Sequence, residues 1–129
     1  MSITTPGISR KVITVGCSDD DREVLVGGNR MVDYSGRGPT AACICKPDLV
    51  APGCSVVSCA GRADKYTIKS GTSMSTPIVS GATALLLERY PDMTNKDVKL
   101  KLRESCRDIG LPRNQQGWGL LDVEKLVSK

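Results

Sequence analysis

The hydrophobic positions of this chain concentrate in one long segment, residues 73–90, where apolar and small side chains leave almost no polar face. Its apolar residues include Ile78, Val79, Ala82, Ala84, Leu85, Leu86 and Leu87. A helix that is apolar on nearly all sides is typical of the inside of a core. Pro77 is tolerated because it lies near the start, and Pro91 ends the segment. The pattern predicts a central, buried helix, with Gly81 and Ala82 allowing a neighbouring backbone to approach closely.

The residues after Pro91 predict two further helices. Thr94 followed by Asp97 resembles a capping box with a shorter acid, which marks a helix start. Apolar residues then recur at i, i+4 and i+8, as Val98, Leu102 and Cys106. This spacing predicts an amphipathic helix that runs to about Cys106. A last short helix is expected after Asp122, with Val123, Leu126 and Val127 facing inward.

Shorter apolar runs predict strands. Residues 12–15 are all β-branched (Val, Ile, Thr, Val) and uncharged, which is typical of a strand buried on both faces in a parallel sheet. Residues 49–51 form a second run that ends at a Pro-Gly turn signal. Residues 55–59 and 65–68 flank a polar stretch and predict an antiparallel hairpin that leads into the long helix. The polar, glycine-containing stretch 18–38 predicts a surface segment.

Composition fits one globular unit and narrows the range of partners. At 129 residues the chain is long enough for one domain with a modest core, and 40% of its residues are hydrophobic. The net charge of +4 is too small to indicate a nucleic-acid partner. The sequence contains neither a recognisable signal peptide nor an apolar run long enough to span a membrane. We therefore expect neither a nucleic-acid nor a membrane partner.

The six cysteines allow two interpretations. They are Cys17, Cys43, Cys45, Cys54, Cys59 and Cys106. A disulfide framework is one, but the spacing lacks the density of a stapled mini-protein, and several cysteines lie in strand-like runs where they act as small hydrophobes. Cys43 and Cys45 would share one face of an extended segment. Because the chain has no histidine and no C-x-x-C pair, we expect no metal and no cofactor. Free thiols favour a reducing compartment, which leans toward the cytoplasm.

Residues 70–77 are the strongest candidate for chemistry. They present Ser73 at the start of the long apolar helix, after Gly71 and among small residues. A serine hydroxyl is a weak nucleophile unless a base lies beside it, and that base is usually histidine. The chain contains none. Ser73 is therefore either a plain helix N-cap or a nucleophile whose base lies on sequence outside this chain.

Five stretches, in order along the chain, resemble the subtilisin-like serine proteases (subtilases). They are Lys11–Gly16, Tyr34–Pro39, Lys46–Gly53, Gly71–Pro77 and Gly117–Leu121. The resemblance implies an α/β fold: part of a three-layer subtilisin-like architecture, with parallel strands, a hairpin and a central buried helix. It implies that residues 1–129 are the C-terminal portion of a catalytic domain, because the family's Asp-bearing and His-bearing segments precede the serine.

The resemblance also implies roles for individual residues. Ser73 would be the nucleophile, and its backbone N–H would form half of the oxyanion hole. Thr72 would support the same region, Met74 would lie against the site, and Gly71 would let substrate backbone approach closely. The family commonly has histidine where this chain has Ile78, although that histidine is not the catalytic base. A cis peptide bond at Thr5–Pro6 is also expected.

Two functions remain open from the sequence. In the first, the chain supplies the nucleophile of a serine endopeptidase, acts on peptide or protein substrates and is inactive without its missing N-terminal half. In the second, it is a non-catalytic scaffold or binding module that kept the fold. In either case, unpaired strand edge and apolar surface would favour a homodimer of the isolated chain.

Overall fold

The computed structural model describes residues 2–19, 30–31, 35–63 and 65–128. Its main sheet has the strand order β2-β1-β3. β1 (Val15–Asp19) pairs in parallel with β3 (Leu49–Pro52), in a register that runs from Val15 opposite Leu49 to Ser18 opposite Pro52. β2 (Arg30–Met31) pairs with the other edge of β1 in antiparallel fashion. The expected parallel strands are therefore present.

The first strand lies further along the chain than the sequence predicts. The segment 12–15 is predicted to be buried on both faces, yet Val12 is 37% exposed and Ile13 is only half-buried. Pairing with β3 begins at Val15, so residues 12–14 lead into the strand instead of forming it. The residues that are fully enclosed are Cys17 and Ser18 of β1.

The prediction that residues 18–38 form a surface segment is wrong at Ser18 and at Ser35. Ser18 and Ser35 each have 0% exposure. The Ser35 hydroxyl tolerates burial because its Oγ accepts a hydrogen bond from the backbone N–H of Cys17 at 3.0 Å, which satisfies both groups inside the sheet. Residues 20–29 and 32–34 of this stretch lie outside the described part of the chain.

In the described part of the chain, the strands are followed by the helices α1 (Thr72–Arg89), α2 (Asn95–Ser105), α3 (Arg113–Gln116) and α4 (Val123–Val127). The capping box predicted for α2 is confirmed: Asp97 N–H donates to Thr94 Oγ1, and Thr94 N–H donates to an Asp97 carboxylate oxygen. α2 ends where the spacing predicted, and α4 confirms the expected last helix. The single turn of α3 was not predicted.

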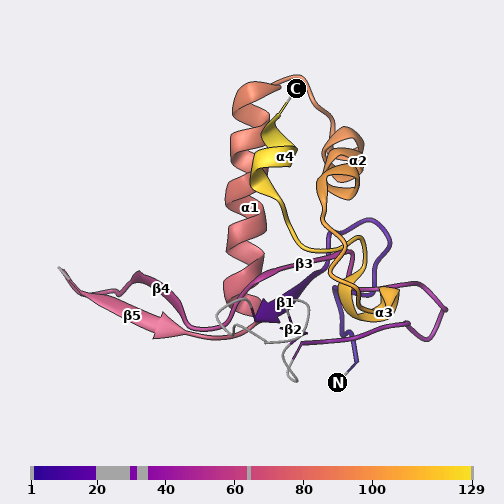
Figure 1. Ribbon diagram of the computed structural model, residues 1–129, viewed down its shortest axis with the longest axis horizontal. Coiled ribbons are helices and arrows are strands. Elements are labelled where there is room, and N and C mark those ends of the chain that lie inside the picture. The colour runs from indigo at the N-terminus through magenta and orange to yellow at the C-terminus, as the bar shows by residue number, and fades with distance from the viewer. Residues whose placement is uncertain (1, 20–29, 32–34, 64, 129) are drawn as a thin grey trace.

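One hydrophobic core joins β3 to three of the helices. Its buried members are Leu49, Ala51, Val79, Ala82, Leu86, Val98, Leu102 and Leu126. These residues come from β3, α1, α2 and α4, which explains why the three helices stand together on one side of the strands (Figure 1). Burial of these side chains holds α1, and with it the segment that carries Ser73, against the sheet.

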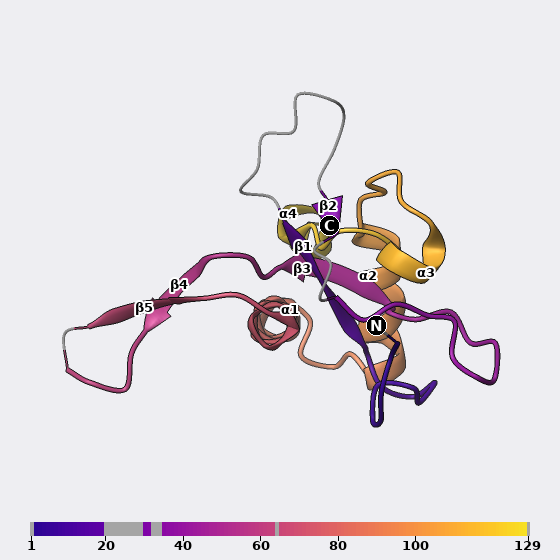
Figure 2. The same ribbon diagram turned by 90° about the horizontal axis from the view of Figure 1, so that it is seen from below.

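The expectation that α1 is buried on all sides is wrong for the described chain. Its buried residues are Ser75, Val79, Ala82 and Leu86, which form a single stripe. Leu85 is 50% exposed, Ala84 is exposed, and a Cβ added at Gly81 would meet nothing within 4 Å. Figure 2 looks along α1 and shows the strands of the sheet on one side of it. An apolar sequence shows that a helix can pack on every side, but within the described part of the chain only one flank of α1 is packed.

Residues 117–121 return to the sheet and give β3 a second neighbour. Val50 N–H donates to Gly119 O and Leu121 N–H donates to Val50 O, each at 2.9 Å, in a parallel bridge between Val50 and Leu120. The approach is close enough to require glycine at position 117, where a Cβ would collide with the carbonyl oxygens of Pro47 and Asp48. Gly117 also has a φ of 60°, which favours glycine.

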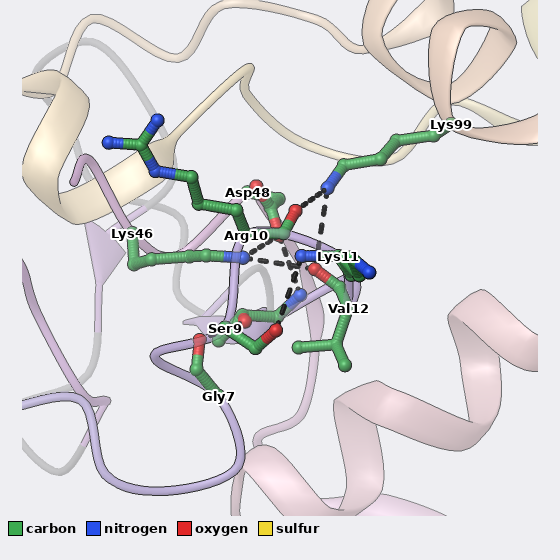
Figure 3. Close-up of polar contacts among 9 residues, drawn as sticks. Gly7, Ser9, Arg10, Lys11, Val12, Lys46, Asp48 and Lys99 are labelled. Carbon is green, nitrogen blue, oxygen red and sulfur yellow. Dashed lines mark hydrogen bonds and ion pairs between the residues drawn. The ribbon is translucent and has the colours of Figure 1, made fainter. Parts of the chain in front are cut away.

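A buried ion pair fixes the segments that enter β1 and β3 (Figure 3). Lys46 is 1% exposed and Asp48 8%, and the Lys46 Nζ lies 2.7 Å from Asp48 Oδ2. Lys46 Nζ also donates to Val12 O at 3.0 Å, while Asp48 Oδ2 accepts from Thr14 N–H at 2.8 Å. The pair thus satisfies its own charges and two backbone groups of the segment that precedes β1.

One further expectation concerns the backbone near the start of the chain. The Thr5–Pro6 peptide bond is cis, as the resemblance implied. No helix among the described residues is long and apolar enough to cross a bilayer.

Candidate active site

The candidate site is built where the hairpin meets α1. β4 (Val56–Cys59) and β5 (Tyr66–Lys69) pair in antiparallel fashion, which confirms the predicted hairpin, and the two strands extend away from the rest of the molecule (Figures 1 and 2). Between the end of β5 and the start of α1 only Ser70 and Gly71 remain. This short turn delivers Ser73 to the first turn of the helix.

Gly71 makes that turn possible. Its φ of 151° lies in a region that favours glycine, and an added Cβ would meet only Ser73 N, at 3.8 Å. The requirement for glycine is therefore conformational, and the space around its α-carbon is open. Gly71 O accepts the first helical bonds, from Met74 N–H at 2.9 Å and Ser75 N–H at 3.3 Å.

Hydrogen bonds to β3 and to the residue that follows it hold the turn in place. Gly71 N–H donates to Gly53 O at 2.8 Å, and the buried Ser75 Oγ donates to Ala51 O at 2.9 Å. There is no room for a side chain at Gly53, because a Cβ would collide with Ser75 Oγ and lie 2.5 Å from Cys17 Sγ. Ser70 Oγ accepts from Ser55 N–H at 2.7 Å and ties the turn to the start of the hairpin.

Ser73 is not an N-cap. The cap position of α1 is Gly71, with no side-chain cap hydrogen bond, and Ser73 is the second residue of the helix. Its side chain is exposed, and among the described residues no group pairs with its hydroxyl or accepts its backbone N–H. The N–H groups of a first helical turn carry the positive end of the helix dipole. The position therefore offers both an accessible hydroxyl and an unused donor for a developing negative charge.

Ser73 lines two cavities at once. One, of about 540 Å³, lies between the hairpin and α1 and includes Met74 in its wall. The other, of about 520 Å³, lies between the start of α1 and residues 2–7 and 12–15, and includes Thr72. The structure thus brings Thr72, Ser73 and Met74 together at one helix end, and Gly71 shapes the turn without lining either cavity.

Three residues of this region were missed by the sequence interpretation. Ser75 and Gly53 position the turn, and Lys69 lines the cavity on the hairpin side. A signal for Ser75 was present, because it lies at i, i+4, i+7 and i+11 with Val79, Ala82 and Leu86 on the buried stripe. Gly53 and Lys69 depend on contacts with segments distant in sequence, which spacing does not record.

The cysteines do not change this chemistry. Cys43, Cys45, Cys54, Cys59 and Cys106 are free thiols. Cys43 has a φ of 57° and lies in a turn closed by its N–H donating to Thr40 O at 2.8 Å, so the expected extended segment at 43–45 is wrong. Among the described residues no cluster of three or more His, Cys, Asp or Glu side chains could hold a metal ion.

Comparison with known proteins agrees with this geometry. The sequence model of the subtilase family matches residues 1–119. The chain belongs to the subtilase family.

Among curated subtilase relatives, the serine protease AprX of Bacillus subtilis (strain 168) is 37% identical over 115 residues, which cover 79% of this chain and 26% of AprX. The halolysin-like extracellular serine protease Nep of Natrialba magadii is 32% identical over 127 residues, or 98% of this chain and 21% of Nep. The chain thus spans about a quarter of the length of these relatives. Family membership supports a peptidase function.

Solved subtilase structures show the same fold. The CspB protease of Clostridium perfringens matches 95% of this chain and 27% of its own, with a TM-score of 0.81 and 30% identity. Fervidolysin of Fervidobacterium pennivorans matches 95% of this chain with a TM-score of 0.78 at 22% identity, a likeness of fold alone. The predicted partial subtilisin-like α/β fold is confirmed.

Proposed function

We propose that this chain supplies the nucleophile of a serine endopeptidase, with Ser73 Oγ attacking the carbonyl carbon of a peptide bond. The observation that carries the proposal is the placement of Ser73, which is exposed in the first turn of α1 between two cavities. Its backbone N–H is one donor to the oxyanion that forms on attack. Subtilase relatives that are serine proteases support this class of reaction.

The neighbours of Ser73 take supporting roles in this proposal. Gly71 holds the strained turn and leaves open space for substrate backbone. Thr72 forms part of the wall of the cavity beside residues 2–7, and Met74 part of the wall of the cavity beside the hairpin. A substrate that crosses the helix end would contact Thr72 on one side of its scissile bond and Met74 on the other.

The proposed reaction needs a base that this chain does not contain. Nucleophilic attack by serine requires removal of the hydroxyl proton, and the 129 residues include no histidine. We place the Asp and His of the triad, in the family's order Asp, His, Ser, on polypeptide outside this sequence. Without them Ser73 keeps the reactivity of an ordinary alcohol, and the chain alone is inactive.

The same outside region would cover the open flank of α1. Leu85 is 50% exposed there, next to the exposed Ala84 and Gly81. An apolar flank of this kind favours association. In the absence of the covering region, a second copy of the chain takes its place, and light scattering at micromolar concentration should report a dimer. A monomer across that range would contradict this part of the proposal.

The decisive experiment joins the chain to the polypeptide that carries the Asp and His motifs. The joined protein should hydrolyse casein and react with a fluorophosphonate probe at Ser73, whereas the chain alone should do neither. Ser73→Ala should abolish both signals, and Ser80→Ala, on the exposed side of α1, should leave both. If the neighbouring coding sequence has no Asp and His motifs, the chain is a non-catalytic scaffold or binding module instead.

A further inference from the structure

The two faces of the hairpin differ in their exposure to solvent. Residues directly opposite in an antiparallel pair point to the same face. One face carries Val56, Ser58, Thr67 and Lys69, and the other carries Val57, Cys59, Tyr66 and Ile68. The second face points to solvent, since Val57 is 63%, Ile68 66% and Tyr66 74% exposed. On the first face Val56 and Thr67 are half-buried, while Ser58 and Lys69 are exposed. All four residues of the first face line the cavity between the hairpin and α1, against only Val57 and Cys59 of the second. The face that carries Lys69 is therefore the one turned toward α1.

Among the described residues, Lys69 is the only charged one in the wall of the cavity between the hairpin and α1. That wall includes Ser73, so a side chain held in the cavity lies beside the reacting serine. None of the residues in the wall is acidic, and within the described part of the chain Lys69 forms no ion pair. As far as the described residues show, the cavity thus presents one positive charge without an acidic partner, in the same wall as the proposed nucleophile.

The rest of the wall defines the shape of side chain that would fit. Val56, Pro77 and Ile78 offer apolar surface, while Ser58 and Thr67 add hydroxyl groups near the strand that carries Lys69. A short aliphatic stem with a carboxylate at its end matches this combination of apolar wall and ammonium group. Glutamate has both, aspartate has a shorter stem, and lysine or arginine would bring two positive charges together.

We propose that Lys69 makes the protease prefer substrates with an acidic residue, glutamate above all, at one position beside the scissile bond. This inference rests on the proposed function of Ser73. Because Lys69 is exposed, the attraction is that of a partly solvated charge pair, which corresponds to a preference of about two- to fivefold in kcat/KM for Glu over Gln. Salt screens such a pair, so the preference should shrink as ionic strength rises.

The test uses the chain joined to its base-bearing region and a set of internally quenched peptides. Glu, Gln or Lys is placed in turn at each of the three positions on either side of the scissile bond. At one position Glu should exceed Gln by about two- to fivefold and Lys should be the poorest. Lys69→Met should make Glu and Gln equal, and Lys69→Glu should invert the order. Lys65→Glu is the matched control, because Lys65 lies beside the same strand but does not line the cavity, and it should preserve the order.

Failure of this inference is distinct from failure of the proposed function. An active protease whose preferences are the same in the parent protein, in Lys69→Met and in Lys69→Glu would overturn the role of Lys69 and leave Ser73 as nucleophile. Equilibrium binding of the Glu and Gln peptides to the Ser73→Ala protein, by fluorescence anisotropy, tests Lys69 without catalysis. If the joined protein is inactive, tighter binding of the Glu peptide that disappears in Lys69→Met still supports Lys69, and equal binding refutes it.

Discussion

The hydroxyl of Ser75 donates a hydrogen bond to the backbone carbonyl of Ala51 at 2.9 Å, across 24 residues of sequence. Ser75 has 0% exposure and lies two residues after Ser73 in the same turn of α1. Ala51 belongs to β3, the strand that forms most of the sheet side of the core. The position of the proposed nucleophile is therefore fixed by a bond between helix and sheet and not by the helix alone.

Loss of this bond should destabilise the chain measurably. Ser75→Ala removes the donor and leaves the Ala51 carbonyl buried without it, which costs about 1–3 kcal/mol of unfolding free energy. Urea denaturation followed by circular dichroism measures the change. Ser80→Ala is the matched control, since Ser80 is exposed on the same helix and bonds only to Thr76 O, and its effect should stay within about 0.5 kcal/mol.

Two glycine substitutions should change the stability of the chain in opposite directions. Gly53→Ala forces a Cβ into contact with Ser75 Oγ and Cys17 Sγ, and overpacking of this kind costs about 1–3 kcal/mol. Gly81→Ala places a Cβ where nothing lies within 4 Å, inside a helix, and should stabilise by about 0.5–1 kcal/mol. Thermal unfolding of both variants checks the pair. A stabilised Gly53→Ala variant would contradict the close packing beneath the turn.

The buried ion pair should show strong coupling in a double-mutant cycle. Lys46→Met leaves the Asp48 carboxylate buried without its ammonium partner, and breaking such a pair costs about 3–5 kcal/mol. Asp48→Asn strands the Lys46 charge in the same way. The double variant should be less destabilised than the sum of the two by about 1–3 kcal/mol. Strictly additive effects would show that the two charges do not interact.

Cys106 should react with an alkylating reagent more slowly than the exposed thiols of the chain. Burial, with a smaller contribution from the Asp122 carboxylate, raises the pKa of Cys106 to about 12. Because the thiolate is the reactive form, iodoacetamide at pH 8 should label the exposed Cys43, Cys45 and Cys59 well before Cys106. Peptide mass spectrometry over time resolves the order. Equal rates at Cys59 and Cys106 would contradict the burial.

The raised pKa of Cys106 also makes the stability of the folded chain depend on pH in the alkaline range. The folded-state pKa of Cys106 lies above the value of about 8.5 for an unfolded thiol, so the folded state holds its proton more tightly. This contribution to stability is complete below about pH 8.5 and is lost as the pH rises toward 12. Urea midpoints should therefore fall more steeply above about pH 8.5 for the parent chain than for Cys106→Ala.

Local pattern was sufficient for elements whose determinants lie close together in sequence. The capping box of Thr94 and Asp97, the i, i+4 spacing of Val98 and Leu102, and the two runs of the hairpin each record a local preference. The flank of α1 that remains open could not be predicted in the same way. Leu85 and Val79 are equally apolar in sequence, and only the presence of β1, β3 and α4 on one side distinguishes them.

The same distinction between local and distant determinants applies to the candidate site. The position of Ser73 in the first turn of a helix followed from its flanking residues and from resemblance. Its support by Ser75, Gly53 and Ala51 depends on the approach of β3, and the place of Lys69 depends on which way the hairpin turns. Spacing could indicate that Ser75 is buried, because it lies four residues before Val79 on the same stripe. The contacts with β3 and the direction of the hairpin are not recorded in a short stretch of sequence, so spacing could not predict them.

The return of residues 117–121 to β3 has a consequence for how the chain acquires its structure during synthesis. Val50 exchanges backbone bonds with Gly119 and Leu121, and Trp118 N–H donates to Asp48 O at 2.6 Å. One side of β3 therefore stays unsatisfied until about 70 further residues have left the ribosome, well after α1 has emerged. Over that interval the nascent chain exposes the unpaired edge of β3 beside the apolar helix α1. A nascent chain stalled after residue 116 should consequently be captured by ribosome-associated chaperones more strongly than one stalled with residue 121 already outside the exit tunnel.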